Sequence, residues 1–66
     1  MEIKFNKKIY NLKAVKSTIR AYRGLADFDF KQKGAYIKVE LKNINKDVEK
    51  IIKDEFCNYV LFSMKL

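Results

Sequence analysis

Residues 27–42, DFDFKQKGAYIKVELK, decide the fold of this chain. Apolar and polar side chains alternate over residues 27–31 and again over 35–42, the period-two pattern of a half-buried strand. Gln32-Lys33-Gly34 lies between the two runs, and Gly34 can supply the positive φ that a tight turn requires. The stretch therefore predicts a β-hairpin. We expect its buried face to carry Phe28, Phe30, Ile37, Val39 and Leu41.

The segment before the hairpin predicts a strand and then a helix. Residues 2–9 alternate in polarity, so we expect a strand with Ile3, Phe5 and Ile9 turned inward. Asn11 is a favourable N-cap for a helix from Leu12 to about Arg23, and Gly24 suits the left-handed position that ends many helices. The expected buried face of this helix consists of Leu12, Val15, Ile19, Tyr22 and Ala26.

The segment after the hairpin predicts a second helix. Asn45 can cap it, and the acidic side chains of Asp47 and Glu49 suit its positive N-terminal end. We expect the helix to run from Lys46 to near the C-terminus.

The element order β-α-β-β-α predicts one α+β domain over residues 1–66. A right-handed crossover makes the first two strands parallel, and the third inserts between them to give the order 1-3-2. Both helices then cover one face of a ferredoxin-like sheet that lacks its fourth strand. The first strand is left with an open edge, which is a possible site of strand pairing.

Composition argues against an enzyme. The 66 residues include no histidine, one cysteine (Cys57) and two glycines. The chain thus lacks the commonest general base, a Cys-rich metal site and a Gly-rich phosphate loop. We expect no catalytic, metal-binding or cofactor-binding residues. No apolar run reaches the length of a membrane span and no signal peptide is evident, so we expect a cytoplasmic protein.

The second helix carries more apolar surface than a small sheet can cover. Tyr59, Phe62 and Leu66 continue the stripe of Val48 and Ile52, and Glu55 falls within that stripe, as a rim position or one of a buried pair. A second apolar face predicts an interface with another subunit or a partner protein, unless the helix wraps the sheet or ends early. That predicted interface consists of Phe56, Cys57, Val60, Leu61 and Met64.

Positive charge is concentrated in the first part of the chain. The net charge is +7, and residues 1–26 carry seven basic side chains against Glu2 alone, or +6. A solvated helix face would explain these cations, and so would a surface that attracts anions or an acidic partner. The predicted basic patch consists of Lys4, Lys8, Lys13, Lys16, Arg20 and Arg23.

A set of short apolar motifs adds a family resemblance. They are Phe5, Tyr10, Ala14-Val15-Lys16, Tyr22, Val39, Leu41 and Glu55-Phe56-Cys57-Asn58-Tyr59-Val60-Leu61. Over roughly residues 3–61 the chain resembles the small D-type proteins of His-Xaa-Ser peptide-maturation systems (HxsD). That family accompanies radical-chemistry maturation enzymes and a His-Xaa-Ser repeat peptide. The resemblance implies an accessory, partner-binding role without chemistry of its own.

These observations favour a small non-enzymatic protein-binding adaptor or accessory subunit. It would form a homodimer or hetero-complex through its C-terminal helix, and its basic first helix would attract an acidic protein or peptide. The alternative is a basic nucleic-acid-binding protein that contacts phosphates with weak sequence specificity, because Tyr36 is the one aromatic expected on the open sheet face.

Overall fold

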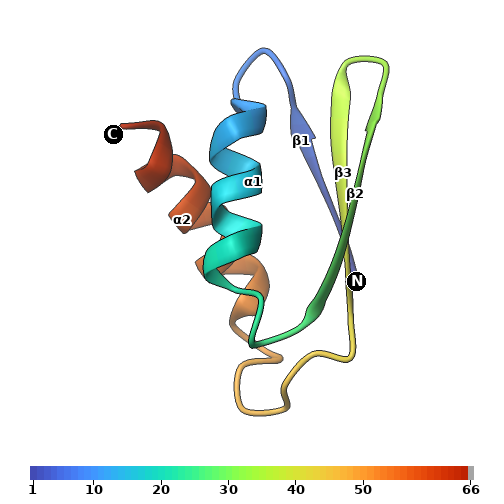
Figure 1. Ribbon diagram of the computed structural model, residues 1–66, viewed down its shortest axis with the longest axis vertical. Coiled ribbons are helices and arrows are strands. Elements are labelled where there is room, and N and C mark those ends of the chain that lie inside the picture. The colour runs from blue at the N-terminus through green and yellow to red at the C-terminus, as the bar shows by residue number, and fades with distance from the viewer. Residues whose placement is uncertain (66) are drawn as a thin grey trace.

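The structure is a computed structural model that describes residues 1–65, so Leu66, which we placed on the inward stripe, lies outside the described residues. Its elements are β1 (Glu2–Asn6), α1 (Leu12–Ala21), β2 (Asp27–Lys33), β3 (Tyr36–Lys42) and α2 (Ile52–Met64). The sheet has the order β1-β3-β2, and both helices lie on one side of it (Figure 1). The predicted α+β class, element order and strand order are confirmed.

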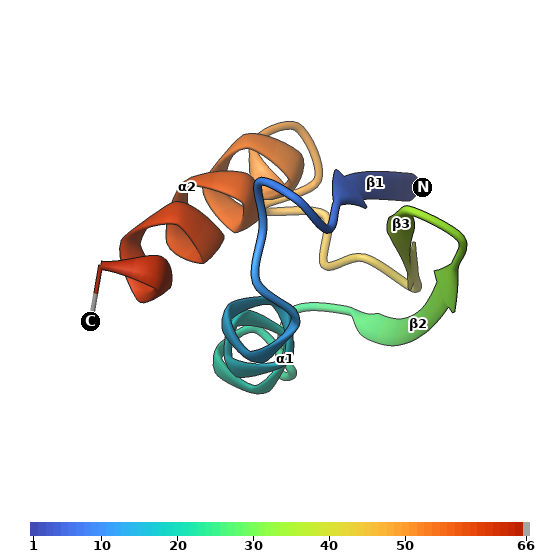
Figure 2. The same cartoon turned by 90° about the horizontal axis from the view of Figure 1, so that it is seen from above.

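The central strand β3 pairs antiparallel with both neighbours, so β1 and β2 run parallel to each other. Its alternation is as predicted, because Ile37, Val39 and Leu41 are buried toward the helices while Glu40 and Lys42 are exposed on the open face. Seen from above, α2 lies on the β1 side of the molecule and α1 on the β2 side (Figure 2). The core is therefore a single layer between the sheet and the two helices.

The turn of the hairpin is one residue shorter than the predicted Gln32-Lys33-Gly34 turn and begins two residues later. β2 continues to Lys33, and the loop consists of Gly34 and Ala35. Gly34 has φ +58° and is the first of the two loop residues, as in a type II′ turn, which matches the twist of the flanking strands. Gly24, in contrast, does not adopt a left-handed conformation. α1 ends at Ala21, and the Tyr22 N–H closes its last turn by donating to the Thr18 carbonyl at 3.0 Å.

The first strand is shorter than predicted because the chain turns sharply at Asn6. The N–H groups of Ile9 and Tyr10 both donate to the Asn6 carbonyl, at 3.0 and 2.8 Å, and the Lys8 N–H donates to its side-chain oxygen at 2.9 Å. Ile9 consequently points to solvent and not into the core. The predicted cap of the first helix is confirmed, since Asn11 Oδ1 accepts from the Ala14 N–H at 3.1 Å.

The second helix begins at Ile52, and the prediction that it begins at Lys46 is wrong. The Asn45 side chain accepts from the Asp47 N–H at 2.9 Å, and the Val48 N–H donates to the Asn45 carbonyl at 3.1 Å. These bonds form successive turns, as asparagine favours, and no helix starts there.

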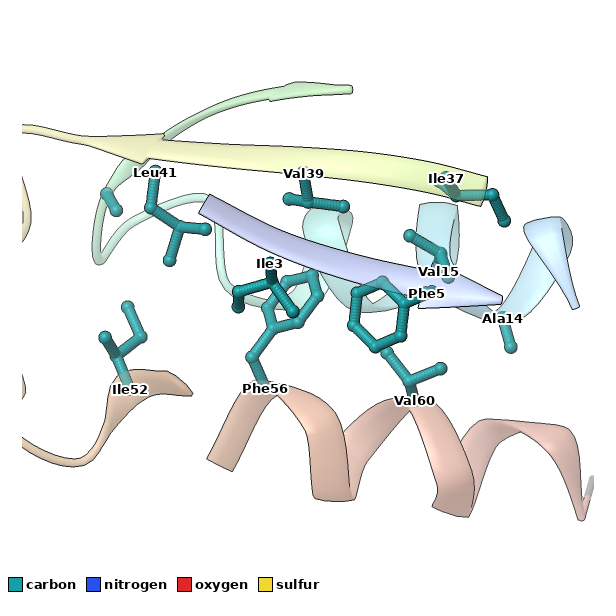
Figure 3. Packing of buried hydrophobic residues seen from close by; sticks show 11 residues of the cluster. Ile3, Phe5, Ala14, Val15, Ile37, Val39, Leu41, Ile52, Phe56 and Val60 are labelled. Atoms are coloured by element: carbon teal, nitrogen blue, oxygen red, sulfur yellow. The ribbon is translucent and has the colours of Figure 1, made fainter. Parts of the chain in front are cut away.

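The inward stripe of α2 also differs from the predicted one. Ile52, Phe56 and Val60, each four residues apart, point from α2 toward the sheet, and Phe56 and Val60 lie beside Ile3 and Phe5 (Figure 3). This rotation leaves Glu55 exposed, so its carboxylate is not one of a buried pair and has no desolvation cost to offset. It also places Phe56 against three other aromatic rings.

Candidate partner-binding surface

The five residues of the predicted interface divide between the core and the surface. Phe56 and Val60 are fully buried in the core, so they are not available to a partner. Cys57 is half-buried. Leu61 and Met64 are exposed and are the two members of the set that a partner can reach.

The exposed apolar surface lies in the last two turns of α2. Leu61, Phe62 and Met64 are 42%, 55% and 38% exposed, and we call them the α2 apolar end. The sheet covers α2 as far as Val60, which faces Phe5 in the last part of β1, and the helix continues beyond the strand (Figure 3). Met64 continues the buried stripe of α2 and is exposed because the sheet ends before it, whereas Leu61 and Phe62 lie on other sides of the helix from that stripe.

A groove separates the α2 apolar end from the first turns of α1. It has a volume of about 390 Å³ and is lined by Asn11, Lys13, Ala14, Ser17, Ser63 and Met64. Most of these side chains are small, so the groove is open to a side chain from another protein. One wall of the groove is apolar, at Met64, and another is cationic, at Lys13.

The predicted basic patch is exposed but does not form one surface. Lys4 lies on the open face of the sheet, whereas Lys13, Lys16 and Arg20 lie on α1, which covers the opposite face, and Arg23 lies in the turn after α1 (Figure 2). Lys8 is in the loop that joins β1 to α1. The fold therefore places the strand cations and the helix cations on opposite faces of the sheet.

A larger set of cations, which shares Lys4, Lys8, Lys13 and Lys16 with the predicted patch, lies toward one end of the molecule. The segments 3–26, 30–39 and 56–65 contain no Asp or Glu. The hairpin turn lies beside the β1–α1 loop, where the Lys7 N–H donates to the Ala35 carbonyl at 2.9 Å, and the start of α1 and the end of α2 lie at the same end (top of Figure 1). We call this region the lysine end. Its cations are Lys4, Lys7, Lys8, Lys13, Lys16, Lys31, Lys33, Lys38 and Lys65.

Three of these lysines form a row across the open face of the sheet. In the strand register Lys38 stands directly opposite both Lys4 and Lys31. Like charges at opposed positions destabilise a sheet, and one ion pair, Lys38 Nζ to Glu2 Oε2 at 3.6 Å, offsets part of the repulsion. A bound anionic group would relieve the remainder. Pairing the two hairpin runs in the sequence would have found Lys31 and Lys33, which the predicted patch lacks.

One aromatic side chain lies on the same half of the open face. Tyr36 is exposed and stands opposite Asn6 on one side and Lys33 on the other. It is flanked by cations but has no second ring beside it on this face in the described part of the chain. The arrangement can stack a single planar group.

The thiol of Cys57 and the acidic side chains are the remaining groups that could take part in chemistry. Burial is the largest influence on the pKa of the Cys57 thiol and raises it, the Lys53 ammonium opposes this, and the Asp54 carboxylate adds to it. Within residues 1–65 no three His, Cys, Asp or Glu side chains lie close enough to hold a metal ion. None of the helices described is long and apolar enough to cross a membrane.

Comparison of the chain with protein-family models, with curated proteins and with solved structures finds no match.

Proposed function

We propose that this protein is a non-enzymatic accessory protein that binds an acidic partner protein through the α2 apolar end and the neighbouring lysine end. The observation that carries the proposal is the exposure of three large apolar side chains, Leu61, Phe62 and Met64, within the last two turns of α2. The resemblance to HxsD-type proteins supports the same accessory role.

Apolar contact supplies the expected affinity. Large apolar side chains that are exposed together on a small domain are typical of interaction surfaces, and burying one fully contributes about 1.5–3 kcal/mol. The groove beside Met64 adds a concave feature into which a partner side chain fits. The apolar end is thus the source of affinity in this proposal.

Charge selects the partner. The lysine end contains nine cations and no Asp or Glu side chain within the segments that form it, so it repels basic surfaces and attracts acidic ones. A second copy of this chain would bring another lysine end to the same interface. We therefore favour a hetero-complex over the homodimer that the sequence left open.

The test compares the protein with two variants in affinity capture and in solution. Leu61→Glu combined with Phe62→Glu places two carboxylates on the α2 apolar end and is expected to abolish capture of an acidic protein. Ile51→Glu is the matched control, because Ile51 is equally exposed at the opposite end of α2 and its replacement is expected to leave capture unchanged.

Light scattering across a dilution series and at two salt concentrations completes the test. The proposal expects a monomer. A dimer that persists on dilution and dissociates in the Leu61→Glu/Phe62→Glu variant would instead identify the apolar end as a self-interface. Equal loss of capture in both variants would contradict the proposal.

A second candidate function is the binding of single-stranded nucleic acid, and the observation that favours it is Tyr36 beside Lys33 and opposite Asn6. Aromatic stacking with nearby cations is the usual combination in such proteins. Replacing Lys31 and Lys38 with Glu should then abolish binding of a labelled oligonucleotide and flatten its dependence on salt. Arg20→Glu with Arg23→Glu, in the last turn of α1 and in the turn that follows it, is the control. The adaptor proposal expects no oligonucleotide binding at physiological salt.

A further inference from the structure

The strand β2 is an edge of the sheet, and its outer backbone groups are free for pairing within the described chain. On β3, Leu41 exchanges hydrogen bonds with Met1 and the Ala35 carbonyl accepts from Lys7, so the odd-numbered residues of this strand bond toward β1. The even-numbered residues must bond toward β2, where they face positions 27, 29, 31 and 33. The N–H and C=O groups of Phe28, Phe30 and Gln32 consequently point away from the sheet.

On the helix-facing side of β2, a partly exposed apolar side chain, Phe30, lies close to a cation of α1, Lys16. Phe30 is 39% exposed although its side chain is on the core side of the sheet, because no further strand covers it. Lys16 Nζ lies 5.3 Å from the centre of the Phe30 ring, a cation–π distance. Arg20 lies in the last turn of α1, which runs beside β2 (Figure 2), and Arg23 follows in the turn after the helix. A strand placed on this edge would lie under a basic helix face.

On the open face of the sheet, the charge along β2 changes from positive near the hairpin turn to negative at the other end of the strand. Lys31 and Lys33 flank the half nearer the hairpin turn, and Asp27 and Asp29 flank the half nearer α1's end. Asn43 Nδ2 donates to Asp27 Oδ2 at 2.8 Å, so part of that acidic half is already engaged. An added strand would therefore be matched by carboxylates near the turn and by neutral or basic side chains at the other end.

We propose that β2 takes an extended acidic segment of a partner protein as an additional strand, in the manner of β-augmentation. The segment bonds to the outward backbone groups of Phe28, Phe30 and Gln32, packs an apolar side chain on Phe30, and places acidic side chains against Lys31 and Lys33. The inference rests on the proposed function in one respect, that the partner is an acidic protein. Its site is separate from the α2 apolar end.

The other sheet edge is less suited to this role. β1 has five residues against seven in β2, and its core-side residues Ile3 and Phe5 are buried, so they leave no apolar contact for an added strand. Strand pairing at β1, which the sequence suggested, stays a prediction.

A second copy of this chain is a poorer occupant of the β2 edge than a bare peptide. Neighbouring strands are about 4.8 Å apart, whereas packed helices need about 8–10 Å between their axes. Because α1 runs beside β2, joining two copies through β2 would force their α1 helices together (Figure 2). An extended peptide carries no helix and meets no such obstacle.

The test uses a fluorescent peptide, Glu-Thr-Glu-Val-Ser-Thr-Ser, whose first three residues oppose Lys33, Gln32 and Lys31 in an antiparallel register. Its anisotropy is measured against the protein and against four variants. Gln32→Pro removes one outward N–H and leaves the bonds to β3 intact, and it is expected to weaken binding about tenfold, while Gln32→Thr keeps the N–H and is its control. Lys31→Glu with Lys33→Glu is expected to weaken binding further and to remove its salt dependence.

Amide exchange provides a readout that does not depend on any variant. Peptide binding is expected to slow exchange at Phe28, Phe30 and Gln32 selectively. Protection elsewhere, or equal binding to the Gln32→Pro and Gln32→Thr proteins when both are folded by circular dichroism, would overturn the proposal. So would a peptide-independent dimer that dissociates in the Gln32→Pro protein, because the occupant would then be a second copy. Leu61→Glu is expected to leave peptide binding unchanged, which separates this site from the α2 apolar end.

Discussion

The rings of Phe28 and Phe56 stack with their centroids 5.5 Å apart and their planes inclined by 22°. The contact joins β2, an edge strand, to the inward stripe of α2. Phe56 also lies 6.0 Å from the Phe5 ring and 5.8 Å from the Tyr22 ring, so one side chain connects β1, α1, β2 and α2. In a domain of 66 residues, this aromatic cluster is a large part of the core.

Replacing Phe56 with leucine is expected to lower the free energy of unfolding by about 1–2 kcal/mol. Aromatic pairs contribute about 0.5–1.5 kcal/mol beyond their buried area, and the smaller side chain leaves part of the site unfilled. Urea denaturation followed by circular dichroism measures the change. Phe62→Leu, on the exposed side of the same helix, is the control and is expected to change stability by less than about 0.5 kcal/mol. Equal effects of the two changes would contradict the assigned inward stripe.

The two glycines are expected to respond to alanine in opposite directions. Gly34 has φ +58°, a conformation that disfavours an L-residue by about 1–2 kcal/mol, so Gly34→Ala should destabilise the protein by about that amount. Gly24 is not left-handed, and a Cβ there would meet no atom within 4 Å. Gly24→Ala should therefore stabilise the protein by about 0.4–1 kcal/mol, since it restricts the unfolded chain. Thermal melts of both variants check the pair, and a loss of stability in Gly24→Ala would show that the α1 C-terminus is misassigned.

The protein is expected to lose stability at alkaline pH through Tyr22. Burial raises the pKa of its phenol, and the charges of Glu55 and Tyr59 add to the shift. The folded state therefore keeps a proton that the unfolded state releases near pH 10, so the free energy of unfolding falls as the pH rises above about 10. Denaturation at several pH values between 8 and 11 measures the loss. Tyr22→Phe should remove this part of it, and a profile identical to that of the unmodified protein would refute the assignment.

Cys57 is expected to alkylate slowly. Its pKa is raised chiefly by burial, so the reactive thiolate is scarce at neutral pH, and the side chain is half-buried. Iodoacetamide at pH 7.5 should modify it at least about threefold more slowly than the same chain unfolded in urea. A rate above that of the unfolded chain would indicate an activated thiol and would argue against the non-enzymatic role.

The local sequence pattern predicts an element correctly where only one local conformation satisfies its residues. The alternation of residues 36–42 predicted which side chains of β3 are buried, and Asn11 predicted the start of α1. The start of α2 was predicted wrongly because asparagine bonds equally well to its own backbone in a turn, as Asn45 does with Asp47. Thr18 was also missed. It is fully buried, and its hydroxyl donates to the Ala14 carbonyl at 2.8 Å. This hydrogen bond compensates for the loss of water around the hydroxyl, so a polar side chain can lie in the core.

The sequence by itself determined the class of fold, the order of the strands and the absence of acidic residues from long stretches of the chain. The tertiary structure alone decided which side of α2 is buried, because that helix is apolar on more than one face and the packing of Phe56 against the rings of Phe5, Tyr22 and Phe28 distinguishes them. It also decided where the cations gather. Lys4, Lys31 and Lys38 are distant in the chain, and strand pairing brings them into one row.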